Sequence, residues 1–280
     1  MAQDLGPEIR KFSLVPDDTS VYAPPAPPRE DEGLNFGGAN LDLTATYMSA
    51  YVYRGLDYDK AVTSHDSANV QFDGRLEFNL GRLPHPFIGV FSNIFDNDPV
   101  TRFQEFRPYL GFDLTVRPLT LEVGNNSYVY PDRESFNTSE AYMKLTLDDS
   151  YLIGTEKPIF SPYIYGAYDY DLNHSFYVEG GIKHEFPIEE TPLKFTVIAD
   201  IAWVSGLEHQ FVEVGVGKAG FQHYDFGVIA SYSLNKLFKD AGRFGQISIN
   251  GYVYYTGGIN RSDFHGVDEL WGGVGIAYHY

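Results

Sequence analysis

The C-terminal segment from Gly272 to Tyr280 alternates between two chemically different faces. Val274, Ile276, Tyr278 and Tyr280 share one face at a period of two, and the residues between them are glycine, alanine and histidine. A final strand that is apolar on one face, small or polar on the other, and closed by an aromatic ring is typical of the signal that the barrel-insertion machinery of Gram-negative bacteria reads. These four residues are the predicted outer-membrane insertion signal, and that machinery is a predicted partner.

The composition is compatible with a barrel and excludes a helical membrane protein. Mean hydropathy is -0.25, and no segment approaches the roughly 20 apolar residues that a membrane helix needs. A barrel strand faces lipid only at every second residue, so its average hydropathy stays low. Aromatic residues make up 16%, with 22 Tyr and 21 Phe, and Cys is absent. This suits aromatic girdles at two membrane interfaces and an oxidising periplasm.

Alternation continues through the chain from Leu41. Odd-numbered residues from Leu41 to Tyr53 form one mainly apolar face, and even-numbered residues from Asp42 to Arg54 form a more polar one. Residues 71–80 place Asp73, Arg75 and Glu77 on a single face. Charges of mixed sign on one face favour a wet interior, because unpaired charges in a packed core cost several kcal/mol each. A soluble β-sandwich with those charges outside fits this strand equally well.

The links between the predicted strands separate the two alternatives. Short links rich in Pro, Gly and Lys (81–86, 117–119, 187–192 and 235–245) alternate with longer polar links (56–69, 132–139, 206–220 and 258–269). Short turns at one rim and long loops at the other are the outer-membrane arrangement. Further strands are predicted at 87–95, 103–116, 119–130, 139–147, 160–169, 176–186, 193–204, 222–234, 246–256 and 270–280. The predicted fold is all-β: a transmembrane antiparallel up-and-down β-barrel of about 12 strands, with both termini periplasmic.

Two regions are expected: a Pro-rich acidic segment over 1–34 and the barrel over 35–280. The run from Tyr22 to Glu32 has polyproline character and no alternation, so it cannot join a sheet. It is a disordered periplasmic tail, a segment docked in the lumen or on the periplasmic rim, or a binding site for a protein partner. No charged and apolar signal segment opens the sequence, so Met1 to Gln3 are interpreted as a mature N-terminus with an added initiator Met. The expected location is the bacterial outer membrane.

Three short motifs carry a family resemblance. Tyr51-Val-Tyr-Arg-Gly55, Tyr128-Val-Tyr-Pro131 and Asn137-Thr-Ser-Glu140 resemble the TorF-type porin family of uncharacterised Gram-negative outer-membrane proteins. The resemblance covers about residues 40–280, so the segment before Leu41 lies outside it. It implies an outer-membrane barrel and a pore, and it supplies no substrate.

The charged residues on the inward-assigned faces are the candidate functional residues. Acidic groups outnumber basic ones there, so an open lumen would favour cations. The candidate pore-lining residues are Arg54, Arg75, Arg107, Glu105, Asp113, Asp73 and Glu77. Alternatively, these charges pair across strands and plug the lumen, because a barrel of about 12 strands has little room once long side chains fill it.

Other chemistries find little support. The net charge of -18 disfavours nucleic acid as a partner; the expected surroundings are outer-membrane lipid and lipopolysaccharide. No acidic loop shows the spacing of a calcium site, and no metal or cofactor is expected. No nucleophile elbow or Ser-plus-His barrel signature accompanies His184, His223 beside Asp225, or His174 with Ser175. His265 near Asp263 and Asp268 is a weak metal candidate. An enzyme is not expected.

The predicted function is a porin-like channel for passive diffusion of small hydrophilic solutes, with modest cation preference. The alternative is a non-conducting structural or assembly barrel that anchors residues 1–34 to a periplasmic or outer-membrane partner.

Overall fold

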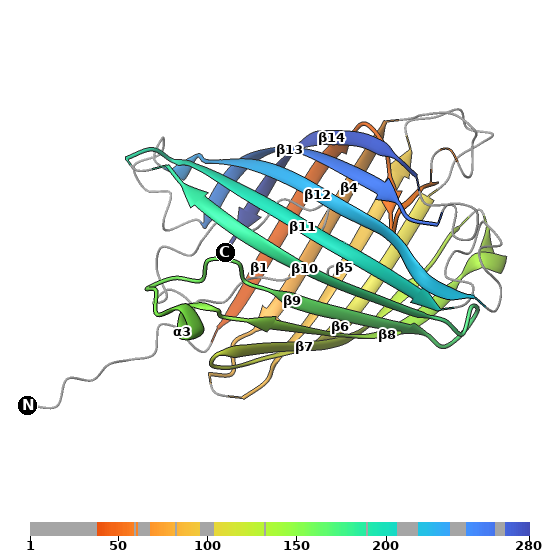
Figure 1. Ribbon diagram of the computed structural model, residues 1–280, viewed down its shortest axis with the longest axis horizontal. Coiled ribbons are helices and arrows are strands. Elements are labelled where there is room, and N and C mark those ends of the chain that lie inside the picture. Colours follow the sequence, from red (N-terminus) through yellow and green to blue (C-terminus); the bar gives the residue numbers. More distant parts are fainter. Residues whose placement is uncertain are drawn as a thin grey trace, which may run out of the picture.

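The chain forms a closed antiparallel β-barrel (Figure 1). The computed structural model describes residues 38–58, 60, 68–81, 83–95, 104–131, 133–188, 190–205, 218–235, 245–260 and 267–280. The barrel strands are β1 (Ala39–Met48), β4 (Asn69–Phe78), β5 (His85–Phe95), β6 (Gln104–Val116), β7 (Leu119–Tyr128), β8 (Thr138–Leu147), β9 (Tyr163–Asp169), β10 (Phe176–Pro187), β11 (Leu193–Ser205), β12 (Ala219–Ser233), β13 (Gln246–Gly258) and β14 (Glu269–His279). The predicted all-β, twelve-strand, up-and-down architecture is confirmed. Within the described ranges no helix has the length and apolar character to cross a membrane.

The barrel closes where its first strand meets its last. β1 pairs with β14 from Asp42↔His279 to Met48↔Gly273, and with β4 on its other side. Leu41 and Tyr280 exchange backbone hydrogen bonds of 2.8 and 2.9 Å, with each residue donating once. Closure removes the two free edges that an open sheet would present. β1 therefore begins, and β14 ends, at the same end of the barrel.

The outward face is apolar on every side of the barrel. Exposed outward residues include Leu43, Phe72, Ile88, Leu110, Val123, Met143, Ile164, Val178, Ile201, Phe226, Val253 and Ile276. A soluble β-sandwich would bury this face in its core, and a soluble monomer rarely exposes a contiguous apolar patch above a few hundred Å². The inward face carries the charges, as predicted. The arrangement is that of a barrel whose outer surface meets hydrocarbon.

The two ends of the barrel carry different links. We call the end with Ala39 and His279 the terminal rim; Figure 1 shows α3 (Ser150–Ile153) and the C-terminus at this end. The β6–β7 turn at 117–118 is here, and it is short, as predicted. The link at 148–162 is also here, although it is long and contains α3. The expected rule of short turns at one rim therefore holds only in part, because α3 adds a covering element there. The opposite rim carries a 3-10 helix, η1 (Glu134–Phe136).

The first strand is shorter than predicted. Alternation in the sequence extends to Arg54, but β1 ends at Met48, and Val52–Tyr53 (β2) and Leu56–Asp57 (β3) pair only with each other. Ser49 still pairs with the barrel wall, since its backbone N–H donates to the carbonyl of Gly272 at 2.9 Å. The chain leaves the barrel wall after this residue, and Arg54 is not on a barrel strand.

A charge at mid-height of the outward face should be costly in lipid. Leu110→Arg, in the middle of β6, is expected to lower the free energy of unfolding by about 2–4 kcal/mol, because the guanidinium would face hydrocarbon. The matched control is Val116→Arg at the end of the same strand, where the cost should fall to about 0–1 kcal/mol. Both side chains are well exposed, at 56% and 64%. Denaturant titration in lipid vesicles measures the difference; equal costs at the two positions would contradict a lipid-facing belt.

Candidate functional site

A short hairpin fills part of the lumen. β2 and β3 are joined by a turn at Arg54 and Gly55, whose φ values are +47° and +72°, a backbone region that glycine adopts without steric cost. All residues from 51 to 58 are buried. A link lying outside the rim would be exposed, so this burial places residues 50–58 inside the barrel. We call these residues the inward hairpin.

The inward hairpin reaches opposite walls of the barrel. On one side, the Tyr51 hydroxyl donates to Glu105 of β6 at 3.1 Å. On the other, Gly55 lies against His223 of β12, so closely that a Cβ on Gly55 would stand 2.5 Å from the imidazole Nδ1. β6 and β12 are six places apart in the closed order of twelve strands, which makes them diametrically opposed. The hairpin therefore crosses the lumen.

Arg54 fixes the tip of the hairpin to the wall. Its Nη2 donates to both carboxylate oxygens of Glu140 on β8, at 2.9 and 3.1 Å. Its guanidinium carbon also lies 4.3 Å from the ring centroid of Tyr177 on β10, a cation–π contact. Both ion-pair partners are buried, with side-chain exposures of 6% and 2%. Breaking such a pair from one side leaves a buried charge and costs about 3–5 kcal/mol.

Tyrosine hydroxyls extend this ion pair into a network. The Tyr128 hydroxyl donates to Glu140 Oε1 at 2.7 Å, and the Tyr53 and Tyr128 hydroxyls are 2.7 Å apart. Since the Tyr128 proton is committed to Glu140, Tyr53 donates to Tyr128. Asn126 adds a further donor to Glu140 at 2.9 Å. Several donors around one carboxylate stabilise its charged form inside the barrel.

Arg107 and Glu105 form a second buried pair beneath the hairpin. They are two residues apart on β6, so both point inward, and Arg107 Nε donates to Glu105 at 2.8 Å. Arg107 Nη2 also donates to the Tyr51 hydroxyl at 3.1 Å. Its guanidinium carbon lies 4.3 Å from the Tyr128 ring centroid and 4.7 Å from that of Tyr53. The pair thus contacts two rings of the hairpin, Tyr51 and Tyr53, and the Tyr128 ring of the wall.

A further charged layer lies toward the terminal rim. Arg75 on β4 donates to Glu122 on β7 at 3.0 Å and to Glu77 at 3.4 Å. Tyr109 donates to Asp73 at 3.2 Å. Small residues make room for these rings: a Cβ on Gly89 would stand 2.2 Å from the Tyr109 ring. The interior is therefore packed with paired charges and aromatic rings at this height.

The end of the inward hairpin supplies one titrating group that is not on a barrel strand. Burial raises the pKa of the Asp57 carboxyl, although Lys60 Nζ lies 3.1 Å away and opposes that rise. Lys60 is itself partly exposed. This end of the hairpin thus faces the opposite rim, where solvent begins.

The predicted pore-lining residues do not form one ring. The structure brings Arg54, Arg107 and Glu105 together around the hairpin. Arg75, Asp73 and Glu77 lie in the next layer, and Asp113 pairs with His85 near the terminal rim, away from the hairpin. All seven are 8% exposed or less. A wide water-filled pore would leave its lining accessible, so these seven side chains do not line such a pore in this structure.

The inward faces carry more buried acids than bases. The buried carboxylates among them include Asp42, Asp73, Glu77, Glu105, Asp113, Glu122, Glu140, Glu179, Asp200 and Asp225, against Arg54, Arg75, Arg107 and Lys144. Among the buried residues, these positions agree with the predicted excess of acidic groups in the lumen. This excess of acidic groups can select ions only if the lumen has an open passage.

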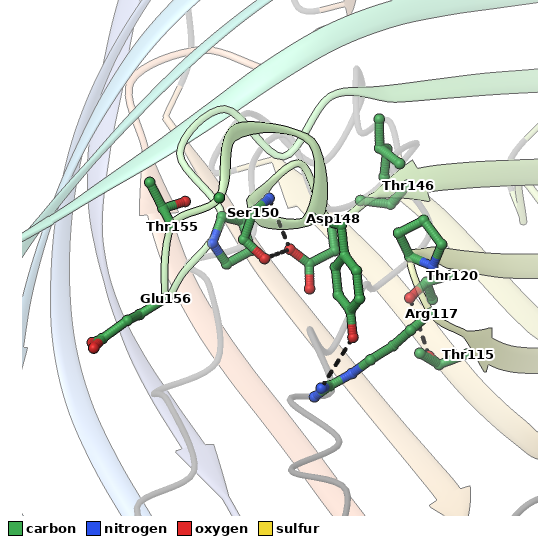
Figure 2. A pocket seen from close by; sticks show the side chains of 13 residues that line it. Thr115, Arg117, Thr120, Thr146, Asp148, Ser150, Thr155 and Glu156 are labelled. Carbon is green, nitrogen blue, oxygen red and sulfur yellow. Dashed lines mark hydrogen bonds between the residues drawn. The ribbon is translucent and has the colours of Figure 1, made fainter.

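A pocket of about 500 Å³ lies at the terminal rim between the β6–β7 turn and the α3 link. Figure 2 shows Thr115 facing Thr120, whose hydroxyls are 3.1 Å apart, and Ser150 turned toward Asp148. The Ser150 N–H donates to Asp148 Oδ1 at 3.1 Å. The pocket is lined by hydroxyl groups, by the charged residues Arg117, Asp148 and Glu156, and by apolar atoms, without histidine. This is a polar mouth beside an exposed apolar helix, without the constellation of a hydrolase.

The histidines that were weighed for catalysis lie apart. His174 is exposed at the opposite rim, with φ of +49°. His184 bonds the carbonyl of Ile159. His223 contacts the Tyr177 hydroxyl at 3.4 Å and Gln222 at 3.3 Å. His265 and Asp263, like residues 1–37, lie outside the described residues.

The four residues of the predicted insertion signal all belong to the last strand and its end. Val274, Ile276 and Tyr280 are exposed on the outer face, at 59%, 48% and 49%. Tyr278 pairs across to Leu43 on the same face. Their outward orientation agrees with the predicted apolar face; their reading by an insertion machinery stays a prediction.

Sequence reasoning missed the inward hairpin. Its residues up to Arg54 continue the alternation of β1, so nothing in the period of two marks the departure after Ser49, and residues from Leu56 were predicted as a polar link. The available signal was Arg54-Gly55 between Val52-Tyr53 and Leu56-Asp57, a turn pattern at the end of an apparent strand. Glycine in a strand pattern often marks such a break.

Comparison with known proteins gives one family and several solved barrels. Residues 36–231 match the model of a family described as "Bacterial protein of unknown function (Gcw_chp)". No curated protein matches the sequence. An outer membrane channel from Pseudomonas putida F1 is similar with a TM-score of 0.49 and 10% identity, over 91% of this chain and 99% of that one.

Two further similar structures are LpxR from Salmonella typhimurium and outer membrane phospholipase A from Escherichia coli. The first has a TM-score of 0.45 and 11% identity over 85% of this chain and 99% of the other. The second has a TM-score of 0.43 and 14% identity over 89% and 93%. The barrel assignment rests on the strand pairing of this chain itself.

Loss of Arg54 should destabilise the protein through the charge it leaves behind. Arg54→Ala is expected to lower the free energy of unfolding by about 3 kcal/mol, because Glu140 stays buried without its guanidinium. The double variant Arg54→Ala with Glu140→Gln should lose less than the sum of the two single variants, because no uncompensated charge remains.

The matched control is Arg117→Ala at the exposed β6–β7 turn, which should change stability by about 0.5 kcal/mol or less. Denaturant unfolding of the four variants gives the coupling energy. Strict additivity would show that Arg54 and Glu140 do not interact energetically.

Proposed function

The protein belongs to this family of bacterial proteins of unknown function. From the closed barrel and the contents of its lumen, we propose that it is an outer-membrane, porin-like channel whose lumen is closed by the inward hairpin. In this reading small hydrophilic solutes pass by diffusion when the hairpin leaves the lumen. The observation that carries the proposal is a single short segment that bridges opposite walls of an otherwise polar barrel.

The membrane part of the proposal is supported by the chain's own surface. Each barrel strand pairs with a neighbour on both sides, so the sheet is closed, and the outward side chains are apolar around the circumference. In hydrocarbon, only helices and closed barrels satisfy their backbone polar groups. The terminal rim carries the short β6–β7 turn, the start of β1 and the end of β14. This rim is then the periplasmic side, as in other barrels with short periplasmic turns. The finer TorF-type naming is part of this proposal.

The closed state is supported by the contacts of the hairpin. Its anchors include the Arg54–Glu140 pair, the Tyr51–Glu105 bond and the packing of Gly55 on His223, and its aromatic side chains belong to a buried cluster with wall residues. The remaining wall is held by ladder hydrogen bonds that do not involve the hairpin. The hairpin can therefore move without opening the barrel, which is the property a gate requires.

Cation preference follows from what the hairpin would leave behind. Displacing it removes Arg54 from the lumen while Glu140, Glu179 and Asp200 stay on the wall. Acidic walls in a low-dielectric tube concentrate cations. The preference for cations therefore belongs to the open state.

A second candidate is supported by the burial of all seven predicted pore residues. A barrel that never opens would be a non-conducting structural element, and its purpose would be to hold residues 1–34 for a periplasmic or outer-membrane partner. The paired charges and aromatic rings of the interior would then only make the barrel rigid. Conductance separates the two proposals.

Replacing the hairpin should open the channel. With residues 50–58 exchanged for glycine and serine at equal length, steady single-channel steps are expected in planar bilayers, whereas the natural protein should be closed most of the time. Leu152→Ser, on exposed α3 at the terminal rim, is the matched control and should behave like the natural protein. Removing residues 2–33 from both proteins tests whether that segment also blocks the lumen. Silence from every variant, with folding verified by heat-modifiable gel mobility, would leave only the structural barrel.

The open channel should prefer cations. Under a potassium chloride gradient, the barrel with the replaced hairpin is expected to give a reversal potential whose sign indicates higher permeability to potassium than to chloride. Adding Glu140→Gln should move this potential toward zero, because one wall carboxylate is neutralised. Gln71→Asn, a neutral change on the inward face of β4, should leave it unchanged. A chloride-directed potential would contradict the acidic-wall explanation.

A further inference from the structure

Three metal-ligating side chains converge inside the barrel near the terminal rim. Glu77 is on β4, His85 begins β5 and Asp113 is on β6, so they come from three neighbouring strands. His85 and Asp113 are direct cross-strand partners. One ligand atom from each of the three lies within 4.8 Å of the others, and all three residues are buried. The group lies outside the hairpin network and has no role in the proposed gate.

The imidazole of His85 is held in a defined tautomer. Its Nε2 lies 2.9 Å from the carbonyl oxygen of Gly81 in the β4–β5 turn. A carbonyl only accepts, so Nε2 carries the proton and donates it. Donation of the second ring N–H to a backbone carbonyl is the usual arrangement around a metal-binding histidine, because it fixes the ring and raises the basicity of the other nitrogen. The nitrogen left to face the two carboxylates is Nδ1.

The spacing between His85 and Glu77 fits a shared cation. Nδ1 and Glu77 Oε1 are 3.5 Å apart. A charge-assisted N–H···O bond brings these atoms to about 2.7–2.9 Å. Two ligands bound at about 2.0–2.1 Å in a tetrahedral zinc site stand about 3.4 Å apart. The observed separation matches the second value.

The neighbouring charges orient Glu77 toward His85. Arg75 engages the other oxygen of Glu77, Oε2, at 3.4 Å, so Oε1 is the atom turned toward His85. Glu179, Asp200 and His223 form a comparable group in the described part of the chain. There, however, the ring nitrogens of His223 face the side chains of Gln222 and Tyr177, whereas the Gly81 carbonyl fixes the ring of His85. The terminal-rim group is the better candidate.

We propose that Glu77, His85 and Asp113 bind a divalent transition-metal cation, with Zn²⁺ as the ion expected. One imidazole nitrogen with two carboxylate oxygens is a donor set that zinc accepts, whereas Ca²⁺ and Mg²⁺ prefer oxygen alone. The ion clamps the β4–β5 turn to β6 on the lumen side of the terminal rim. This site is independent of whether the barrel conducts.

The test uses the full-length protein refolded in detergent, with Zn²⁺ alone as the titrant in isothermal titration calorimetry. His85→Gln keeps a donor for the Gly81 carbonyl, and Asp113→Asn keeps the side-chain shape. Each is expected to weaken zinc binding by about tenfold or more. His174→Gln, at an exposed position of the opposite rim, is the matched control and should bind as the natural protein does. Co²⁺ in place of Zn²⁺ should give visible absorption bands that His85→Gln removes.

The proposal is overturned if the natural protein takes up no zinc, an outcome that needs no variant. It is also overturned if zinc binding survives both His85→Gln and Asp113→Asn, or if His174→Gln weakens it equally. A zinc-dependent rise in the melting temperature of the natural protein, lost in His85→Gln, would support the clamp. Heat-modifiable gel mobility confirms that each variant is folded before it is titrated.

Discussion

Closure of the sheet is the constraint on which the rest of the structure depends. A strand edge exposed to hydrocarbon would leave backbone N–H and C=O groups without partners, each at a cost of several kcal/mol. The pairing of β1 with β14 removes that edge. Once the sheet is closed, side chains at alternate positions have only two destinations, lipid or lumen, and every later feature of the molecule follows from how the lumen side is filled.

The lumen is filled by charge pairs held between aromatic rings rather than by an aliphatic core. Arg107 illustrates the principle: its charge is balanced by Glu105, and its faces lie over the Tyr53 and Tyr128 rings. A guanidinium tolerates this environment because it is weakly hydrated and can pair and stack at once. In the channel that we propose, the lumen opens where a segment can leave it while the barrel wall stays intact. The inward hairpin is the segment so placed, since it belongs to a link and carries no ladder bonds to the barrel.

The fold was largely predictable, whereas the site was not. The inward orientation of Asp73, Arg75, Glu77, Glu105, Arg107 and Asp113 follows from a period of two, because a strand leaves no other choice of face. Their grouping does not follow from it. Arg54 shares the period of β1 but lies on the hairpin, and Asp113 belongs with His85 at the terminal rim. Which inward residues meet depends on strand register and stagger around the barrel, and neither is written in the pattern of a single strand.

The sequence by itself determined the class of solvent and the number of strands. Alternating apolar and polar residues, joined by short links and long links in turn, favour a sheet with one face toward lipid over a soluble sandwich. The even number of strands brings the start of β1 and the end of β14 to one rim. Only the tertiary structure decided whether the lumen is open. The first half of the hairpin, up to Arg54, continues the local pattern of a strand, but the burial of the hairpin against β6 and β12 is a long-range contact between segments far apart in the chain. Local periodicity carries no information about such contacts, because it describes the side of a strand and not what lies across the barrel from it.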